Sequence, residues 1–191
     1  MTRPPFGELD APQEPTGLSE IVVFLDTEFT SMATPQLLSL GLVSETGDEL
    51  YVEVAGAKDM VVSDFVKVEV LPLLGKHDPI VLSYDDIASS LEVWFDSLRG
   101  GDRTIGIVLI SDYPVDWMLV SELRVPMPGE PSWTRAANIG GRMVQNLMTS
   151  GRQVGEYFDQ IEDFHRKHRQ QHHALVDARA MKFAISKMGF E

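Results

Sequence analysis

Residues 21–30 read IVVFLDTEFT, and the interpretation of the whole chain starts from this stretch. Five apolar residues run directly into the two acids Asp26 and Glu28. A short, uninterrupted and β-branched-rich run is typical of a strand that is buried on both faces. Side chains two residues apart on a strand share a face, so both carboxylates are predicted to point the same way. Such a pair is costly to desolvate and favours a bound cation, although an isolated D-x-E is more often explained by a strand that simply ends in water.

The composition is that of an ordinary globular chain of one domain. It has 191 residues, of which 43% are hydrophobic and 24% are charged. There is no apolar run of the ~20 residues that a transmembrane helix needs and no signal peptide, so no membrane partner is expected. The absence of cysteine removes disulfides and thiolate chemistry and makes a cytoplasmic location the default expectation. A net charge of -13 argues against a protein that coats nucleic acid, but not against an enzyme that acts on it.

The order of the predicted elements indicates an α/β fold. Residues 1–20 hold four of the eleven prolines and are expected to form a flexible arm, followed by one domain at 21–191. The predicted strands are 21–29, 36–44, 49–54, 104–110 and an edge strand near 133–138, and the predicted helices are 83–98, 117–123, 151–167 and 174–188. The first two connections resemble hairpins and the next crosses over through a helix. This order predicts a mixed sheet with helices packed against it.

A second candidate acid is Asp116, which follows the strand predicted at 104–110. Strand-to-helix corners of this kind are where α/β proteins place their sites. Asp112 lies four residues earlier and is a competing carboxylate. Either acid can also be explained as a helix cap, because the two flank Pro114 near a predicted helix start. Metal binding and helix capping therefore both remain open at this point.

The third candidate is the stretch QHHALVDARAM at residues 171–181. On a helix, the side chain of Asp177 leaves from a stripe of alanine and methionine residues. A carboxylate on an apolar stripe has to be paired or to bind a metal. His172 lies five residues before Asp177, at the expected helix start, where the chain can fold back toward the same site. The alternative is a zinc site made from His165, His168, His172 and His173, but such clusters without a closing ligand are usually surface features.

Together these residues resemble the DEDDh 3′–5′ exonuclease superfamily, which includes the proofreading exonuclease of replicative DNA polymerase, ribonuclease T and oligoribonuclease. The matching residues are Asp26 and Glu28 on the first strand, Asp116 after a later strand, and His172 with Asp177 in an H-x4-D motif. The likeness spans about residues 21–188. The H-x4-D motif followed by a helix is specific, whereas D-x-E alone is not.

The second motif departs from the family pattern. Many members carry an Asn four residues before the second-motif Asp, whereas Asp112 holds that position here. The stretch SDYPVDW, together with the compact length, is most similar to the small stand-alone bacterial exoribonucleases of the RNase AS type. The difference affects contacts within the site rather than the metal ligand.

The resemblance implies a ribonuclease H-like fold, with a five-stranded mixed sheet that begins with three antiparallel strands and is flanked by helices. It also implies two Mg²⁺ or Mn²⁺ ions, held by Asp26, Glu28, Asp116 and Asp177. His172 is the expected general base, because an imidazole titrates near neutral pH, and the motif spacing favours it over His173.

The implied reaction is hydrolysis of single-stranded nucleic acid from its 3′ end, releasing nucleoside 5′-monophosphates, with RNA favoured over DNA and a role in RNA processing. Thr27, Phe29 and Asp112 are the expected substrate contacts, although Phe29 can equally be a core aromatic. Candidate phosphate contacts are Arg135, Arg142, Arg152, Arg166, Lys167 and Arg169. A homodimer is expected by analogy with stand-alone members. The alternatives are a DNA exonuclease, a non-catalytic binding protein, and an enzyme for small phosphodiesters.

Overall fold

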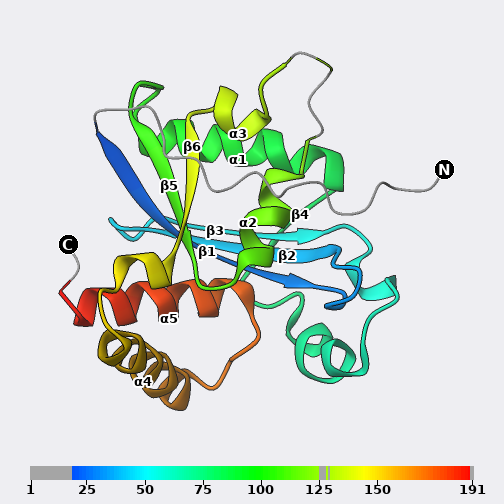
Figure 1. Cartoon of the computed structure of the whole chain (residues 1–191). Helices are drawn as coiled ribbons and strands as arrows, with labels where there is room; N and C mark the ends of the chain where they lie inside the picture. The colour runs from blue at the N-terminus through cyan, green and yellow to red at the C-terminus, as the bar shows by residue number, and fades with distance from the viewer. Residues whose placement is uncertain (1–18, 125–127, 129, 190–191) are drawn as a thin grey trace.

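Six strands form one twisted sheet in the computed structural model, which describes residues 19–124, 128 and 130–189 (Figure 1). The strands are β1 (Glu20–Phe29), β2 (Leu37–Ser44), β3 (Glu49–Val54), β4 (Ile80–Leu82), β5 (Gly106–Ser111) and β6 (Ile139–Met143). Their order across the sheet is β4-β3-β2-β1-β5-β6. The pairs β1–β2 and β2–β3 are antiparallel, whereas β3–β4, β1–β5 and β5–β6 are parallel. The predicted mixed sheet with three antiparallel strands first is confirmed.

The predicted number of five strands is wrong, because β4 adds a short sixth strand at one edge. The other edge strand was also misplaced. Residues Trp133–Ala136 form the single-turn helix α3, which begins where the Ser132 hydroxyl accepts a hydrogen bond from the Arg135 amide. The strand β6 starts only at Ile139. The helix cap formed by Ser132 thus stabilises a helical turn here, although the residues after it also favour a strand.

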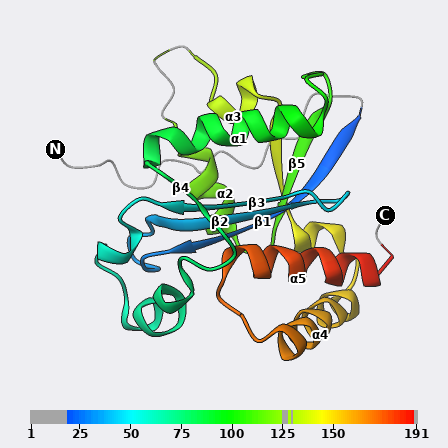
Figure 2. The same ribbon diagram turned by 180° about the vertical axis from the view of Figure 1, so that it is seen from behind.

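Helices cover both faces of the sheet. They are α1 (Tyr84–Leu98), α2 (Pro114–Ser121), α3 (Trp133–Ala136), α4 (Gly151–His168) and α5 (Ala174–Lys187). Figures 1 and 2 show α1 and α3 on one side of the sheet and α5, with α4 beneath it, on the other. Among the described residues, none of the helices has both the length and the apolar character needed to cross a bilayer.

The alternation of side chains along β1 determines which face of the sheet carries Asp26 and Glu28. Val23 and Leu25 belong to the core shared with α1, whereas Phe24 packs against the residues of α4 and α5. Asp26 and Glu28 continue the Phe24 face, because side chains two residues apart point the same way. The acids of β1 therefore lie on the side of the sheet that α5 covers.

A glycine lets α5 approach this face closely. Gly41 of β2 is the register partner of Asp26. A Cβ at Gly41 would come within 2.3–2.4 Å of the backbone of Ala174 and Leu175, the first residues of α5. No side chain fits in that space, so glycine is required for the start of α5 to rest on the sheet beside Asp26.

Several element boundaries differ from the sequence prediction. The helix expected at 117–123 begins three residues earlier, at Pro114, which suits the first position of a helix. Residues 66–73 lie between the predicted elements and form a π-helical turn η2 (Val66–Val70) and a 3₁₀ turn η3 (Leu71–Leu73). The predicted flexible arm at 1–20 lies outside the described residues up to residue 18, and Glu20 is already part of β1.

Candidate metal and catalytic site

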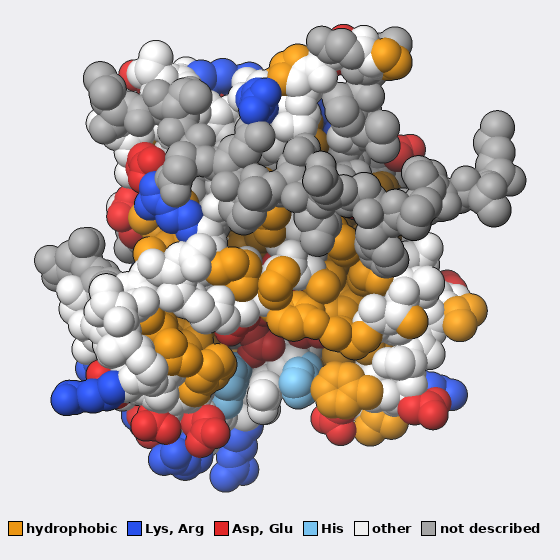
Figure 3. Space-filling model, viewed as in Figure 1, with side chains coloured by type: hydrophobic (Ala, Val, Ile, Leu, Met, Phe, Trp, Pro, Cys, Tyr) orange, Lys and Arg blue, Asp and Glu red, His pale blue; other side chains and the backbone are white. Residues whose placement is uncertain are grey.

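Six residues that the sequence singled out converge in two adjacent groups. The side-chain ligand atoms of Asp26, Asp112 and Asp116 lie within 4.8 Å of one another, and those of Glu28, His172 and Asp177 do the same. The first group joins β1 to the segment after β5, and the second joins β1 to the start of α5. Figure 3 shows acidic side chains in a hollow of this face, with histidine and apolar side chains around them. Segments far apart in sequence thus build one acidic site.

Asp116 is held in place by a threonine of β1. It lies in the first turn of α2 with only 1% of its surface exposed. The hydroxyl of Thr27 donates a hydrogen bond of 2.6 Å to Oδ1 of Asp116. The other oxygen, Oδ2, is buried and has no hydrogen-bond partner among the described residues. Thr27, which is an expected substrate contact, is buried, and its hydroxyl binds Asp116.

Asp112 stands beside Asp116 and is bound to α4. The Tyr157 hydroxyl donates a hydrogen bond of 3.1 Å to Oδ2 of Asp112. Neither acid caps α2, because its N-cap residue is Tyr113 and no side chain makes a capping hydrogen bond there. The helix-capping explanation is therefore wrong for both carboxylates, and Asp112 faces Asp26 and Asp116 instead.

Asp177 is held by the loop before α5 and lies beside α4. The backbone amide of His172 donates a hydrogen bond of 2.9 Å to Oδ2 of Asp177. On the other side, Nε2 of His165 lies 3.3 Å from Oδ1 of Asp177, and both side chains are largely buried. The His165 contact could not be predicted from the sequence, because that histidine lies in a polar run on a different helix.

Burial of several carboxylates in one place shifts their pKa values strongly. Desolvation, followed by repulsion from Asp116 and Asp177, raises the pKa of Asp26 well above its usual range. Burial and the same two acids raise the pKa of Glu28 in the same direction. Burial raises the pKa of Asp116 to about 8, against the opposing hydrogen bond from Thr27. It also raises the pKa of Asp177 to about 8, against the opposing bond from the His172 backbone.

These carboxylates suit divalent hard cations. Acids with strongly raised pKa values in one cleft are destabilised when ionised, and a divalent cation relieves their repulsion. All the grouped ligand atoms except those of His172 are oxygens, which Mg²⁺ and Mn²⁺ prefer. Oδ2 of Asp116 and Oδ1 of Asp177 are buried oxygens without a hydrogen-bond partner among the described residues. Such unsatisfied acceptors are expected where an ion completes the site.

The two neighbouring histidines have different environments. His172 joins Glu28 and Asp177, and its ring meets the Phe65 ring edge-on at 4.9 Å. His173 is 2% exposed and its ring packs between those of Tyr51 and His77. Burial lowers the pKa of both, that of His173 to about 4. The four histidines proposed as a zinc site do not form a common group within the described chain.

Two aromatic residues, Phe29 and Tyr113, directly follow the site acids Glu28 and Asp112 in the sequence. Phe29, at the end of β1, is partly exposed and packs against the core shared with α1. Its ring is nearly parallel to that of Tyr113, with an interplanar angle of 7° and centroids 6.3 Å apart. Phe29 is therefore a partly exposed residue at the border of the core.

Two solved structures share this fold. One is a zinc-bound complex of E. coli exonuclease I with single-stranded DNA, with a TM-score of 0.58, 12% identity, and coverage of 90% of this chain and 42% of that chain. The other is a product-bound structure of exonuclease I, with a TM-score of 0.54, 11% identity, and coverage of 91% and 44%.

The chain thus has an exonuclease I-like fold, which is consistent with the predicted α/β architecture. It spans less than half the length of those two chains. No protein-family model and no curated protein sequence matches this chain. The likeness at such low identity is one of fold, and it agrees with the predicted mixed sheet flanked by helices.

Proposed function

We propose that this chain is a metal-dependent 3′–5′ exonuclease of the DEDDh type that acts on single-stranded nucleic acid. The observation that carries the proposal is the convergence of Asp26, Glu28, Asp116 and Asp177 with His172 in one hollow. Three separate segments deliver these side chains. These five residues of the sequence motifs support the proposal because they lie in the two groups of ligand atoms, together with Asp112.

The metal ligands are proposed to be Asp26, Glu28, Asp116 and Asp177, with two Mg²⁺ or Mn²⁺ ions as the cofactor. When bound, the ions would supply an activated water and stabilise charge on the leaving 3′ oxygen. Asp112 lies within the first group of ligand atoms and adds a carboxylate where many relatives have an amide. Tyr157 binds one of its oxygens, so Asp112 is proposed to orient the site rather than to act as a primary ligand.

His172 is proposed to take the proton of the attacking water. Its ring belongs to the group that contains Glu28 and Asp177, so it stands at the edge of the metal site. Burial lowers its pKa, and a neutral imidazole at pH 7 has a ring nitrogen available to accept a proton. His173 is unsuited to this role, because its ring lies in the core between Tyr51 and His77.

The substrate is proposed to be the free 3′ end of a single strand. The acids lie in a hollow, so the scissile phosphate must descend to them, and a paired terminus would first have to fray at a cost of a few kcal/mol. The fold is shared with a protein that was solved as a complex with single-stranded DNA. That likeness favours DNA as the second candidate substrate, whereas the preference for RNA rests on the SDYPVDW stretch alone.

Phe29 is proposed to contact the terminal base through its accessible edge, with Tyr113 beside it. The backbone of Thr27 remains a candidate for a nucleotide contact, because its hydroxyl is occupied by Asp116. A homodimer is proposed by analogy, and light scattering at micromolar concentration tests it. A cytoplasmic location and a role in RNA processing are proposed from the sequence alone.

The direct test uses 5′-labelled RNA and DNA strands, each with a free or a blocked 3′ end, in Mg²⁺, Mn²⁺ or EDTA. We expect stepwise shortening of free single strands, release of 5′-monophosphates, and no activity in EDTA. Each strand is also tested as a blunt duplex, which should be digested more slowly. Cleavage of the blocked strand or activity in EDTA would contradict the proposal, whereas faster digestion of DNA than RNA would change only the preferred substrate.

A further inference from the structure

One face of α4 meets a carboxylate of each of the two groups. Tyr157 and His165 lie eight residues apart on this helix with Ile161 between them, so the three side chains share a face. The Tyr157 hydroxyl donates a hydrogen bond to Asp112, and Nε2 of His165 lies 3.3 Å from Oδ1 of Asp177. Asp112 belongs to the first group of ligand atoms and Asp177 to the second. The helix therefore supports both groups.

This face of α4 is buried against the domain. Tyr157 is fully buried and belongs to a core cluster that includes Met181 and Ile185 of α5, and Ile161 packs against the same cluster. The side chain of His165 is only 11% exposed. Side chains in a close-packed interior have few alternative positions. A residue on this face can therefore hold a neighbouring group in one orientation.

Asp177 is approached from two directions. Its Oδ2 atom accepts a hydrogen bond from the backbone amide of His172, whereas its Oδ1 atom faces His165 on α4. Oδ1 is buried and has no aligned hydrogen bond among the described residues. A carboxylate oxygen has two lone pairs, so Oδ1 can bind a cation through one and accept the ring proton of His165 through the other.

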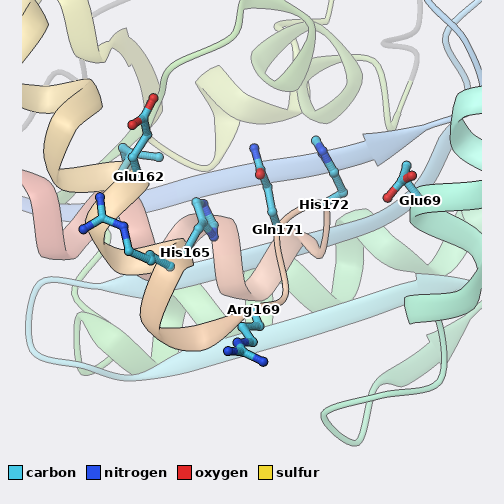
Figure 4. Close-up of a pocket in the computed structure, with 8 residues that line it drawn as sticks. Glu69, Glu162, His165, Arg169, Gln171 and His172 are labelled. Atoms are coloured by element: carbon cyan, nitrogen blue, oxygen red, sulfur yellow. The ribbon is translucent and has the colours of Figure 1, made fainter.

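His165 is not itself placed as a metal ligand. It belongs to neither group of ligand atoms within the part of the chain that the structure describes. Figure 4 shows His165 on α4 beside a cavity of about 520 Å³, whereas His172 stands on the loop that leads to α5. The two histidines thus reach Asp177 from separate segments, and only His172 is part of its group of ligand atoms.

We propose that His165 is a positioning residue, which directs the proton on its Nε2 atom at Oδ1 of Asp177 and holds that carboxylate in the orientation that binds a cation. This inference rests on the proposed metal-dependent function. A carboxylate that binds a metal is commonly held by a hydrogen bond of its own, and loss of such a partner typically lowers metal affinity by about 10–100-fold.

The environment of the His165 ring favours this assignment of its proton. A neutral imidazole carries one ring proton, on either Nδ1 or Nε2. Nδ1 of His165 is buried and has no partner in the described chain, so a proton there would be a buried donor without an acceptor, which is costly. A proton on Nε2 instead faces the carboxylate of Asp177, and a contact with an ionised acceptor is among the stronger ones.

Titration calorimetry with Mn²⁺ tests this role directly. His165→Leu keeps a side chain of similar size without a donor, whereas His165→Gln keeps a donor near the position of Nε2. We expect His165→Leu to raise the Kd for Mn²⁺ about tenfold or more, and His165→Gln to stay within about threefold of the wild type. His168→Leu is the matched control, because His168 lies on the same helix, stacks on Phe164 and should leave the Kd unchanged.

Hydrolysis of a labelled single strand at increasing Mn²⁺ separates positioning from a direct part in the reaction. With His165→Leu, the rate should fall at limiting Mn²⁺ and return to within about threefold of the wild-type rate at saturating Mn²⁺. Thermal melting in EDTA checks that each variant is folded. Should His165→Leu fail to fold, His165→Asn takes its place, because its shorter amide does not reach Asp177.

Three results would overturn this inference. They are an unchanged Kd in the folded variant that lacks the donor, an equal rise in Kd for His165→Gln, and a loss of rate that excess Mn²⁺ does not restore. A wild-type protein that binds no Mn²⁺ would instead overturn the proposed function.

Discussion

The backbone amide of His172 donates a hydrogen bond of 2.9 Å to the Oδ2 atom of Asp177. His172 adopts a left-handed conformation with φ of 67°, so the chain reverses just before α5 begins at Ala174. Asp177 lies in the first turn of that helix, and its side chain reaches back to the loop. The five-residue spacing therefore has two effects. It lets the His172 backbone hold the Asp177 carboxylate, and it places the His172 ring beside Glu28.

Removal of one β1 or α5 carboxylate should abolish activity without unfolding the protein. We expect Asp26→Ala and Asp177→Ala to lower kcat by at least ~1,000-fold, because metal ions supply several kcal/mol of transition-state stabilisation. Titration calorimetry with Mn²⁺ should show weaker binding in both variants. Asp159→Ala is the matched control, because it removes an exposed acid of α4 outside the cluster. Full activity of either site variant would exclude the two-metal mechanism.

The two adjacent histidines should respond differently to substitution. His172→Ala is expected to lower kcat by ~100-fold or more, the usual contribution of a general base, while Mn²⁺ binding is largely kept. His173→Ala should lower the free energy of unfolding by about 1–3 kcal/mol, because its buried ring leaves a cavity between Tyr51 and His77. Chemical denaturation and single-turnover rates separate the two effects. A larger loss of the chemical step in folded His173→Ala would reverse the assignment of the base.

The stability of the metal-free protein should fall as the pH rises. The pKa values of Asp116 and Asp177 are raised to about 8 in the folded state, above the ~4 of an unfolded aspartate. The folded state then binds more protons than the unfolded state between these values, so the stabilisation is complete below pH ~4 and is lost as the pH rises through about 8.

Melting temperatures measured in EDTA should therefore be higher at pH 5 than at pH 8. Addition of Mn²⁺ should raise the melting temperature more at pH 8, where the carboxylates are ionised and ready to bind it. Asp26→Ala should flatten the pH dependence in EDTA, because it removes one of the repelling acids. A metal-free melting temperature that rises from pH 5 to pH 8 would contradict this account of the cluster.

Gly41→Ala should damage both stability and activity. The added Cβ would meet the backbone of Leu175 at 2.3 Å and push the start of α5 away from the sheet. We expect a loss of about 1–3 kcal/mol in the free energy of unfolding and a marked loss of kcat, because overpacking displaces Asp177 from Glu28. Gly155→Ala is the control, since a Cβ there meets nothing within 4 Å and alanine favours helix. Comparable behaviour of the two variants would show that the close approach at Gly41 is unimportant.

Local patterns in the sequence were sufficient to predict the main elements. The apolar run before Asp26, the turn between β2 and β3, and the periodic apolar stripe of α1 each encode their element within a few residues. The short edge strand β4 and the helical turn α3 could not be predicted in this way. Each is too short for its periodicity to be recognised, and each depends on the neighbours against which it packs.

The sequence by itself was sufficient to predict that Asp26, Glu28, His172 and Asp177 lie close together, because strand alternation and the H-x4-D spacing constrain these residues locally. Only the tertiary structure decided what supports them. Thr27 binds Asp116 across 89 residues of chain, and Tyr157 binds Asp112 across 45. Such contacts have no sequence period, because they arise from the packing of α2 and α4 beside the sheet. Local sequence patterns thus indicate the candidate site residues, and long-range packing determines their positions.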